Sequence, residues 1–381
     1  MIPFRKFVLA SLVYFILVSS GAYSDCVRNG NSLVCNNLGQ ISGRIFDDSY
    51  RNITDIKVDN KNEHTDLLNN AFIKMPHLTK ISVVNSRIDS IYSTSIQNLT
   101  NLKQLWFSRD GITKIHQSAF TNLPSLEKIY LSHNELKSIT KGILSNTTAL
   151  KSIILSHNKI STIENEAFFD LPNLKMLALD HNELSTVFVH KLVSHPGVLE
   201  LLWLHNNSLT LLTNYMLEKL GNLQTLNAGF NEISTVEANC FQHTPNLVTL
   251  VLTHNRLKEL DGEVFPRSGM QLLRNLYLDN NLLMYLSSTF FIRAGGLKRA
   301  TLMGNPWHCG CLEEIYRVFR ENGIEEKCQG IFIDNQRPIC VGGDVVNKHC
   351  SHVYSRELSE KYMNYMKRFP VPYVRGFRCV L

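Results

Sequence analysis

Apolar residues recur along this chain in an eleven-residue line, LxxIxLxxNxL, with aliphatic residues at positions 1, 4, 6 and 11 and asparagine at position 9. Because the apolar positions 4 and 6 flank an outward position 5, each line predicts a short strand with one buried face. Successive lines begin 24–26 residues apart. The seven lines in phase are Leu126–Leu136, Leu150–Ile160, Leu174–Leu184, Leu199–Leu209, Leu223–Ile233, Leu247–Leu257 and Leu273–Leu283.

A period of this length with this pattern is typical of the leucine-rich repeat, an α/β solenoid. One turn cannot bury its own apolar face, so the turns must stack. Weaker lines that begin at Ile53, Leu78, Leu102 and Leu297 extend the array to eleven turns. We therefore predict a leucine-rich repeat horseshoe with a parallel concave β-sheet, an architecture whose usual role is recognition.

The asparagine at position 9 lies where the chain leaves the strand, and its amide can bond the backbone of its own and adjacent turns. The first three turns hold Lys61, Ser86 and Asp110 in this slot. Ser86 and Asp110 can make such bonds in part, whereas Lys61 cannot. We therefore expect the N-terminal turns to be less regular.

The second half of several turns also recurs, as Ala119-Phe120 before a Leu-Pro pair and Ala167-Phe168 before another. We expect each Phe to fill the interior on the side away from the sheet. Cys240 stands in the Ala slot before Phe241. We interpret it as a buried free thiol that packs as a small apolar residue.

The N-terminal segment has the features of a secretory signal: Arg5 and Lys6 precede the apolar run Phe7–Val18, and small residues follow at 20–22. The mature chain would keep 37 of the 39 basic residues against 33 acidic ones, a net charge of +4. That charge is spread evenly, which disfavours a nucleic-acid partner. We expect an extracellular protein with no membrane anchor.

The predicted regions are a signal peptide (1–22), an N-terminal cysteine cap (23–52), the repeats (53–305), a C-terminal cysteine cap (306–350) and a short tail (351–381).

Sequons for N-glycosylation agree with export. They begin at Asn52, Asn98, Asn146 and Asn206. Asn98 and Asn146 occupy the same position of their turns, two turns apart. Glycans there would keep that flank of the solenoid from being the partner surface.

Nine cysteines in an exported chain indicate disulfides. Cys26 and Cys35 flank a turn-forming Asn29-Gly30-Asn31, which predicts a disulfide-pinned hairpin over the N-terminal end. After the last turn comes Asn305-Pro-Trp307-His-Cys309-Gly-Cys311, followed by an amphipathic segment, Leu312–Asn322, with Gly323 as its stop. This pattern is typical of the cap that closes extracellular leucine-rich repeat arrays.

The further cysteines at the C-terminal end are Cys328, Cys340, Cys350 and Cys379. All six from Cys309 onward could close as three bridges within the chain. If the cap uses only four, two remain, and one of Cys340, Cys350 or Cys379 could form an interchain bridge. The interchain candidates we favour are Cys350 and Cys379.

Position 5 of each line, and in some turns position 3, points outward on the sheet. Exposed contiguous apolar surface usually marks a partner site, and two of the three tryptophans of the chain fall here. The alternative is a scattered set of good strand formers. The proposed apolar patch is Trp106, Tyr130, Ile154, Met176, Leu201 and Trp203.

Position 8 holds histidine in three successive turns, at His133, His157 and His181. A column of this kind fits a solvated Ser-His-Asn turn, and a pH-dependent contact is the alternative, because charged imidazoles repel. We expect no metal site, since a matching carboxylate or thiol is not evident in the pattern. We expect no cofactor either. No nucleophile–base pair, glycine-rich phosphate loop or acid pair is evident, so we do not expect an enzyme.

The secretory signal, the two cysteine caps, the 24-residue lines and the run Asn305–Glu314 resemble the leucine-rich immune proteins of mosquitoes. The Leu-Ser-His-Asn segments at 131–134 and 155–158 fit this resemblance. It implies a role in haemolymph immune defence, with disulfide-linked leucine-rich repeat partners and binding of complement-like thioester proteins. Long members carry a coiled coil after the cap. Here residues 357–368 allow one short helix, so the chain resembles a coil-less member and the coil's functions do not carry over.

The sequence thus favours a secreted recognition or adaptor protein of innate immunity that binds protein partners or pathogen surfaces through its concave face. A receptor-like trap for a developmental or growth signal is the first alternative. A matrix-type binder is the second, although the mild charge argues against it.

Overall fold

The computed structural model describes residues 26–36, 38–41, 46–61, 63–326, 340–342 and 349–368. The predicted signal peptide, Cys328 and Cys379 lie outside these ranges. The chain divides into two compact units. The first comprises residues 1–136 and 142–150, and the second comprises residues 137–141 and 151–381.

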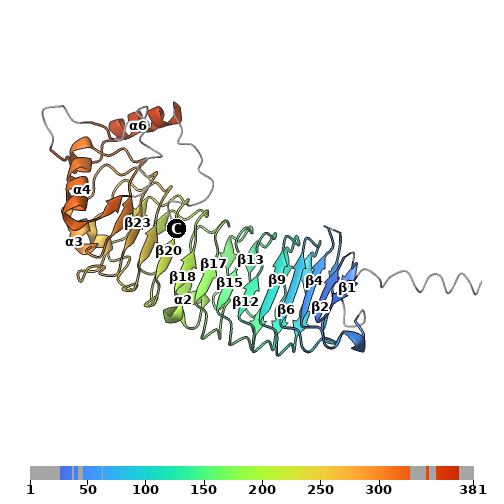
Figure 1. Cartoon of the computed structure of the whole chain (residues 1–381). Helices are drawn as coiled ribbons and strands as arrows, with labels where there is room; N and C mark the ends of the chain where they lie inside the picture. Colours follow the sequence, from blue (N-terminus) through green and yellow to red (C-terminus); the bar gives the residue numbers. More distant parts are fainter. Residues whose placement is uncertain are drawn as a thin grey trace, which may run out of the picture. The chain divides into compact units, whose positions relative to one another are not determined.

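The main sheet of the first unit begins with an antiparallel hairpin and continues with parallel strands (Figure 1). A Cys26–Cys35 disulfide closes the hairpin, and Gly30 turns it with a φ of +62°. This confirms the predicted N-terminal cap. The strands are β1 (Cys26–Asn29), β2 (Ser32–Cys35), β4 (Asp55–Asp59), β6 (Lys80–Val84), β9 (Gln104–Ser108) and β12 (Lys128–Tyr130).

Shorter strands line the return segments of the first unit, where each turn runs back toward the next strand. They are β3 (Gln40–Ile41), β5 (Asp66–Leu67), β7 (Ser90–Ile91), β8 (Ile96–Gln97), β10 (Lys114–Ile115), β11 (Phe120–Thr121) and β14 (Leu144–Ser145), with a 3₁₀ turn η1 (Asp48–Tyr50). The strands β8, β11 and β14 form a parallel three-stranded sheet. Every turn therefore bonds its neighbours at more than one place.

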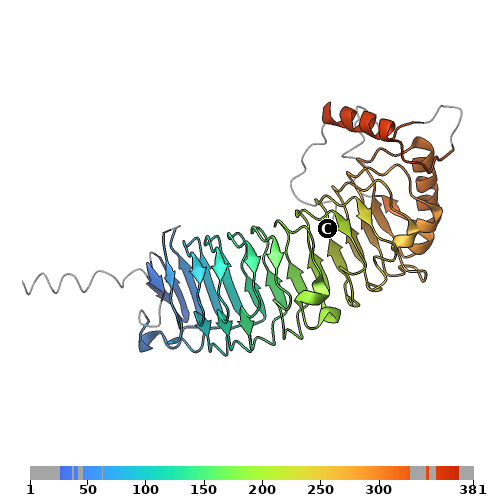
Figure 2. The same ribbon diagram turned by 180° about the vertical axis from the view of Figure 1, so that it is seen from behind.

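The second unit repeats this arrangement with strands of two or three residues in a parallel main sheet (Figure 2). Its main strands are β15 (Ser152–Ile154), β17 (Met176–Ala178), β18 (Leu201–Trp203), β20 (Thr225–Asn227), β22 (Thr249–Val251), β23 (Asn275–Tyr277), β24 (Arg299–Thr301) and β25 (Glu325–Glu326). Its return strands are β13 (Ser138–Ile139), β16 (Thr162–Ile163), β19 (Leu211–Leu212) and β21 (Thr235–Val236).

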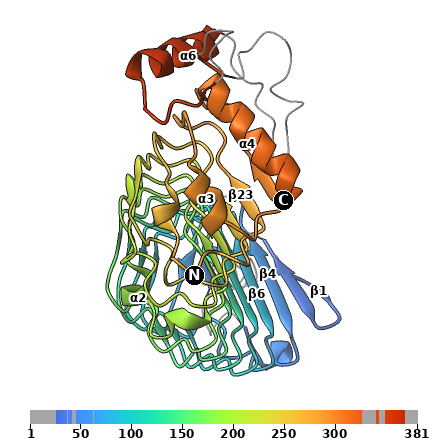
Figure 3. The same ribbon diagram turned by 90° about the vertical axis from the view of Figure 1, so that its left-hand side faces the viewer.

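Among the described residues, α-helices occur only in the second unit. They are α2 (Val189–Leu192), α3 (Ser288–Arg293), α4 (Cys309–Asn322) and α6 (Arg356–Arg368), with 3₁₀ turns η2 (Pro196–Val198) and η3 (Gly262–Val264). Figure 3 shows α4 beside α3 at the C-terminal end of this unit, where Phe319 contacts Phe291 at 5.9 Å between ring centroids. Gly323 ends α4 in the left-handed region, with a φ of +61°, as the sequence predicted. The predicted tail helix is present as α6. None of the described helices is long and apolar enough to cross a membrane.

The core consists of the aliphatic positions of the lines and the recurring Phe of the return segments. Phe241, Phe265 and Phe290 are fully buried in successive turns, with centroids 5.6 and 5.2 Å apart. Cys240 is free and fully buried beside this row, as the sequence predicted, and burial raises the pKa of its thiol. Because each turn buries its Phe against the next, the core forms only in the stacked array.

Asparagine at position 9 connects neighbouring turns through its buried amide. In Asn231 the Oδ1 atom accepts from the backbone N–H of Leu209 at 3.0 Å. Its Nδ2 donates to the carbonyls of Leu204 and Ala228 at 3.0 and 3.1 Å. Asn207, Asn255 and Asn281 make the same set of bonds in their turns. These bonds satisfy backbone groups that the turn would otherwise bury unpaired.

The first turn keeps a buried amide, because Asn60 takes the role that Lys61 cannot fill. Asn60 is fully buried, accepts from the N–H of Leu38 at 2.9 Å and donates to the Leu38 carbonyl at 2.6 Å. Lys61 instead adopts a φ of +53°. The strands β4, β6 and β9 each run five residues. The amide of this turn thus lies one residue earlier than the pattern suggested.

Asp110 occupies position 9 of the turn that begins at Leu102, where a carboxyl group replaces the usual amide. One oxygen, Oδ1, accepts from the N–H of Ser86 at 2.8 Å, whereas Oδ2 is buried without a hydrogen-bond partner. Burial is the main cause that raises the pKa of Asp110 to about 8, against the lowering effect of the Ser86 and Ser108 backbone. A protonated Asp110 would carry a donor where asparagine has its Nδ2.

We expect Asp110→Asn to stabilise the protein most at alkaline pH. The folded pKa lies above the ordinary value, so the folded state keeps a proton that the unfolded state releases, and stability falls as pH rises from about 4 to 8. The loss is on the order of 1 kcal/mol per pH unit. Urea unfolding followed by circular dichroism at pH 5 and pH 9 should show that Asp110→Asn reduces this loss.

Asp89 is exposed in the same unit, so Asp89→Asn is the matched control, because it makes the same substitution without affecting a buried group. It should leave the pH dependence unaltered. If Asp110→Asn gave the same unfolding midpoints as Asp89→Asn at both pH values, the protonated role of Asp110 would be refuted.

Candidate surfaces for partner binding

Each unit presents a strand face, by which we mean the side of its main sheet toward which positions 3 and 5 of the lines point. In the first unit this face carries Trp106 on β9 and Tyr130 on β12, which are register partners. Their rings stack with centroids 3.5 Å apart and an interplanar angle of 11°. Lys80 on β6 lies over the Trp106 ring, with Nζ 5.7 Å from its centroid. The two rings thus cover each other's faces, and the pair is half-buried with a cation over the Trp106 ring.

The strand face of the second unit carries Ile154, Met176, Leu201 and Trp203. Met176 pairs in register with Leu201, and Trp203 pairs with Ala178, which is fully buried between Ile154 and Trp203. All six residues of the proposed patch are half-buried, and none is fully exposed. These side chains alternate with fully buried ones along their strands, and they are less exposed than the sequence analysis expected, because neighbouring side chains on a sheet cover one another.

Position 8 has a conformational requirement that the sequence pattern did not reveal. His133, His157, His181 and His254 all adopt the left-handed region, with φ of +57°, +57°, +53° and +52°. Arg109, Asn206, Phe230 and Asn280 do so at the same position of their turns. Asparagine and histidine are among the residues that tolerate this region best. Backbone conformation therefore explains why histidine recurs here, whatever else the side chains do.

Three strands of the second unit bring a carboxylate among histidines. His157 and His181 stack with ring centroids 3.9 Å apart. Asp180, at position 7, is buried, and its Oδ2 lies 3.0 Å from His181 Nδ1. Ser156 donates to the other oxygen, Oδ1, at 2.7 Å. One donor atom from each of His157, Asp180 and His181 lies within 4.8 Å of the other two.

His205 approaches the same carboxylate from the next turn. Its Nε2 lies 3.6 Å from Asp180 Oδ2, and its ring meets that of His181 edge-on at 5.1 Å. Burial lowers the pKa of His205, Asp180 opposes this shift, and His181 adds to it. His205 is at position 7 rather than position 8, so the column that the sequence suggested omitted it.

The structure places His133 in the first unit and His157 and His181 in the second. Of the three histidines that the sequence grouped, His157 and His181 are the pair whose rings are in contact. The reasoning from sequence also missed Asp180, because it compared positions within the histidine series only. Position 7 of one turn lies beside position 8 of the preceding turn, as the 3.0 Å bond from His157 N–H to the Asp180 carbonyl shows. A carboxylate therefore lies beside these histidines, contrary to the expectation from the sequence.

One serine–histidine pair occurs in the second unit, at Ser194 and His195. The Ser194 Oγ atom lies 2.9 Å from His195 Nδ1 and accepts from the N–H of Asp170 at 3.0 Å. His195 is exposed, and no carboxylate is bonded to it among the residues that the structure describes. The pair therefore lacks the orienting acid of a hydrolytic triad.

The C-terminal cap contains two of the expected disulfides. Cys309 bonds Cys340, and Cys311 bonds Cys350. The bond to Cys311 takes up the Cys350 sulfur within the chain, so Cys350 fits the cap role and not the interchain role. Of the two interchain candidates this leaves Cys379. That residue and Cys328 lie outside the described residues.

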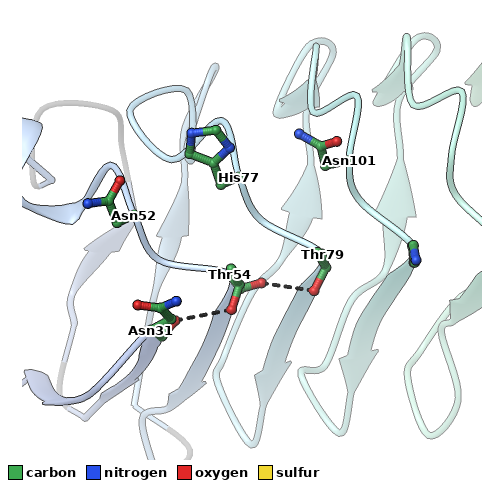
Figure 4. A pocket seen from close by; sticks show the side chains of 7 residues that line it. Asn31, Asn52, Thr54, His77, Thr79 and Asn101 are labelled. Carbon is green, nitrogen blue, oxygen red and sulfur yellow. Dashed lines mark hydrogen bonds between the residues drawn. The ribbon is translucent and has the colours of Figure 1, made fainter.

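A shallow hollow of about 560 Å³ lies on the first unit and is lined by polar side chains (Figure 4). Asn52, which begins the first sequon, lies at its edge with His77 and Asn101. Thr54 and Thr79 also line it, and the Thr79 hydroxyl donates to the Thr54 carbonyl at 3.2 Å. A glycan on Asn52 would cover this hollow.

Two further sequons lie on the three-stranded flank of the first unit. Asn98 and Asn146 are exposed and are joined through Asn122, with side-chain hydrogen bonds of 2.8 and 2.7 Å. Asn206 differs, since it occupies position 8 of the turn that carries Trp203 and His205. A glycan on Asn206 would stand at the edge of the strand face, whereas glycans on Asn98 and Asn146 would not.

Comparisons with known proteins agree with this architecture. A family model described as leucine rich repeat matches residues 76–136, 124–184 and 197–257. Among curated proteins, none matches this sequence. The fold is thus a leucine-rich repeat solenoid with parallel strands and disulfides near both ends, as the sequence predicted.

Solved structures with a similar fold include a chain of the Drosophila Toll–Spatzle complex and a chain of the mouse RP105/MD-1 complex. The first has 22% identity and a TM-score of 0.60 over 70% of this chain and 38% of that one. The second has 20% identity and a TM-score of 0.65 over 79% of this chain and 50% of that one. This chain therefore spans half or less of these two structures.

The leucine-rich repeat domain of APL1 is similar at 24% identity, with a TM-score of 0.55 over 73% of this chain and 68% of that domain. A chain of the LRIM1/APL1C complex matches at 24% identity, with a TM-score of 0.57 over 75% and 49% of the two chains. Likeness at this level of identity establishes the fold that the chains share.

Proposed function

We propose that this chain is an extracellular recognition or adaptor protein of innate immunity that binds protein partners through the strand faces of its two units. The observation that carries the proposal is the Trp106–Tyr130 stack, a half-buried pair of aromatic side chains on the strand face of the first unit. Aromatic residues on an otherwise polar surface are the commonest hot spots of protein interfaces. Met176, Leu201 and Trp203 give the second unit a face of the same kind.

Three further features support this proposal. Disulfides near both ends fit an oxidising, extracellular environment. The structures of similar fold include the LRIM1/APL1C and Toll–Spatzle complexes, in which such solenoids occur with partner proteins. The likeness to the APL1 domain accords with the resemblance of the cap and repeats to mosquito leucine-rich immune proteins. In this proposal complement-like thioester proteins are the first partners to test.

We expect Trp106→Ala combined with Trp203→Ala to weaken partner binding by more than about 30-fold, which corresponds to about 2 kcal/mol. The reason is that truncation removes one aromatic anchor from each strand face. Biolayer interferometry with the full secreted chain would measure binding to a purified thioester protein, to intact bacteria and to a panel of secreted growth factors. Binding to one growth factor alone would replace the immune proposal with that of a ligand trap.

Tyr92→Ala combined with Tyr215→Ala is the matched control, because these tyrosines are 49% and 43% exposed and lie one in each unit away from the strand faces. The control should bind as the wild type does, and circular dichroism should show both double variants folded. Unchanged affinity in the tryptophan double variant would contradict the assignment of the strand faces as partner-binding surfaces.

We also propose that the protein forms a covalent complex through Cys379, which lies outside the described residues. The intact mass measured without reductant should exceed that of one chain, and reductant should return it to the mass of one chain. Cys379→Ser should abolish the larger species. Cys240→Ala should not, because that thiol is fully buried. A monomer with eight paired cysteines would exclude the covalent complex and leave the strand faces unaffected.

A further inference from the structure

We propose that His157, Asp180 and His181 form a binding site for one divalent transition-metal ion, with Zn²⁺ as the ion that these donors suit best. All three residues belong to the second unit and lie at the ends of β15 and β17, which are adjacent in register. The proposal stands independently of the proposed function. It concerns only what this cluster of side chains can bind.

The donor atoms lie at separations that one ion can bridge. Asp180 Oδ2 and His181 Nδ1 are 3.0 Å apart, and the three donors lie within 4.8 Å of one another. With metal–ligand distances near 2.1 Å, donors around a tetrahedral ion are about 3.4 Å apart. The rings of His157 and His181 are stacked at an angle of 25°, so their lone pairs do not yet converge. The exposed His157 ring must turn toward Asp180, and its exposure leaves room for that movement.

The surrounding contacts hold the carboxylate as metal sites require. Ser156 donates to Asp180 Oδ1 at 2.7 Å, which fixes the carboxylate plane and leaves Oδ2 directed at His181 and His205. Backbone hydrogen bonds join the contributing turns at 3.0 Å, from His157 to Asp180, and at 2.9 Å, from His181 to His205. Outer contacts of this kind orient metal ligands and contribute to affinity. Ser156 and His205 are therefore positioning residues for Asp180.

The choice of ion follows from the donors. Two imidazoles with one carboxylate suit Zn²⁺ and similar transition metals, whereas Ca²⁺ and Mg²⁺ require several oxygen ligands. Three protein ligands leave the fourth tetrahedral position open. Since His157 is exposed, that position would face solvent.

The left-handed backbone at position 8 explains histidine there, but it does not explain the buried carboxylate beside it. His254 shows the difference, because it has the same backbone conformation and its N–H donates to the carbonyl of Asp279 at 2.8 Å, yet the Asp279 carboxyl accepts from the Thr301 hydroxyl instead. Its ring stacks on Phe230 at 4.1 Å, its Nε2 contacts Asn280 at 3.0 Å, and Thr253 occupies position 7. A second close group of donors in the described part of the chain, around His352, includes Cys311 and Cys350, which are bonded to each other and are not ligands.

Metal binding can be tested on the full, untagged secreted chain after treatment with a chelator. Isothermal titration with Zn²⁺ should show one ion per chain, and thermal unfolding should shift upward with added Zn²⁺. Titration with Co²⁺ should give the visible absorption of a low-coordinate nitrogen and oxygen site. A strong sulfur-to-metal charge-transfer band would place the ion on a cysteine and overturn the proposal.

The variants His157→Gln and Asp180→Asn separate this site from other histidines. Each should weaken Zn²⁺ binding by more than about 10-fold, since removal of an outer partner alone costs about 10- to 100-fold. Ser156→Ala should weaken binding by about 10-fold for that reason. His254→Gln is the matched control and should bind as the wild type does.

His157 is exposed, so its substitution should not affect folding even if that of buried Asp180 does. The absence of stoichiometric Zn²⁺ binding by the wild type would overturn the proposal. Equal affinities for His157→Gln and His254→Gln would do the same, because the ion would then bind elsewhere.

Discussion

The buried amide of the position-9 asparagine is the interaction on which this solenoid depends. Its two hydrogen-bonding sides join the backbone of one turn to that of the neighbouring turn, as in Asn231. An amide does this without charge, whereas a carboxyl must keep a proton to do it. The raised pKa of Asp110 shows the consequence, since its second oxygen is buried without a partner. Only a side chain with a donor and an acceptor satisfies this position at every pH.

Because the amides and the Phe row determine how the turns stack, positions 3, 5, 7 and 8 can vary without disturbing the core. That freedom allows the strand face to carry Trp106 and Tyr130 in one unit and Trp203 in the other. Position 8 has its own requirement, a positive φ, and histidine and asparagine tolerate it. The histidines near Asp180 thus follow first from backbone geometry. Their grouping around a carboxylate is a separate feature, and it is the basis of the proposed metal site.

The ends of the array need different solutions, because an end turn has no neighbour to bury its apolar face. At the N-terminal end the hairpin β1–β2 extends the sheet and is held by the Cys26–Cys35 bond. At the C-terminal end Trp307 is fully buried and donates to the Leu302 carbonyl at 2.7 Å. The helix α4 then follows, anchored by the bonds of Cys309 and Cys311. The cysteine spacing predicted both caps. Their disulfides stabilise the end turns, which lack a neighbouring turn on one side.

The sequence by itself determined the repeat, the parallel strands, the buried thiol of Cys240, the N-terminal hairpin and the helix that ends at Gly323. These features depend on short-range periodicity and on residue types with few structural roles. It did not reveal that Asn60 replaces Lys61, because a shift of one residue in a turn leaves the apolar period intact. It also did not reveal that Asp180 lies among histidines or that Cys350 bonds Cys311. Only the tertiary structure decided these points, since each depends on which residues of different turns the stacking brings together across more than twenty positions of sequence.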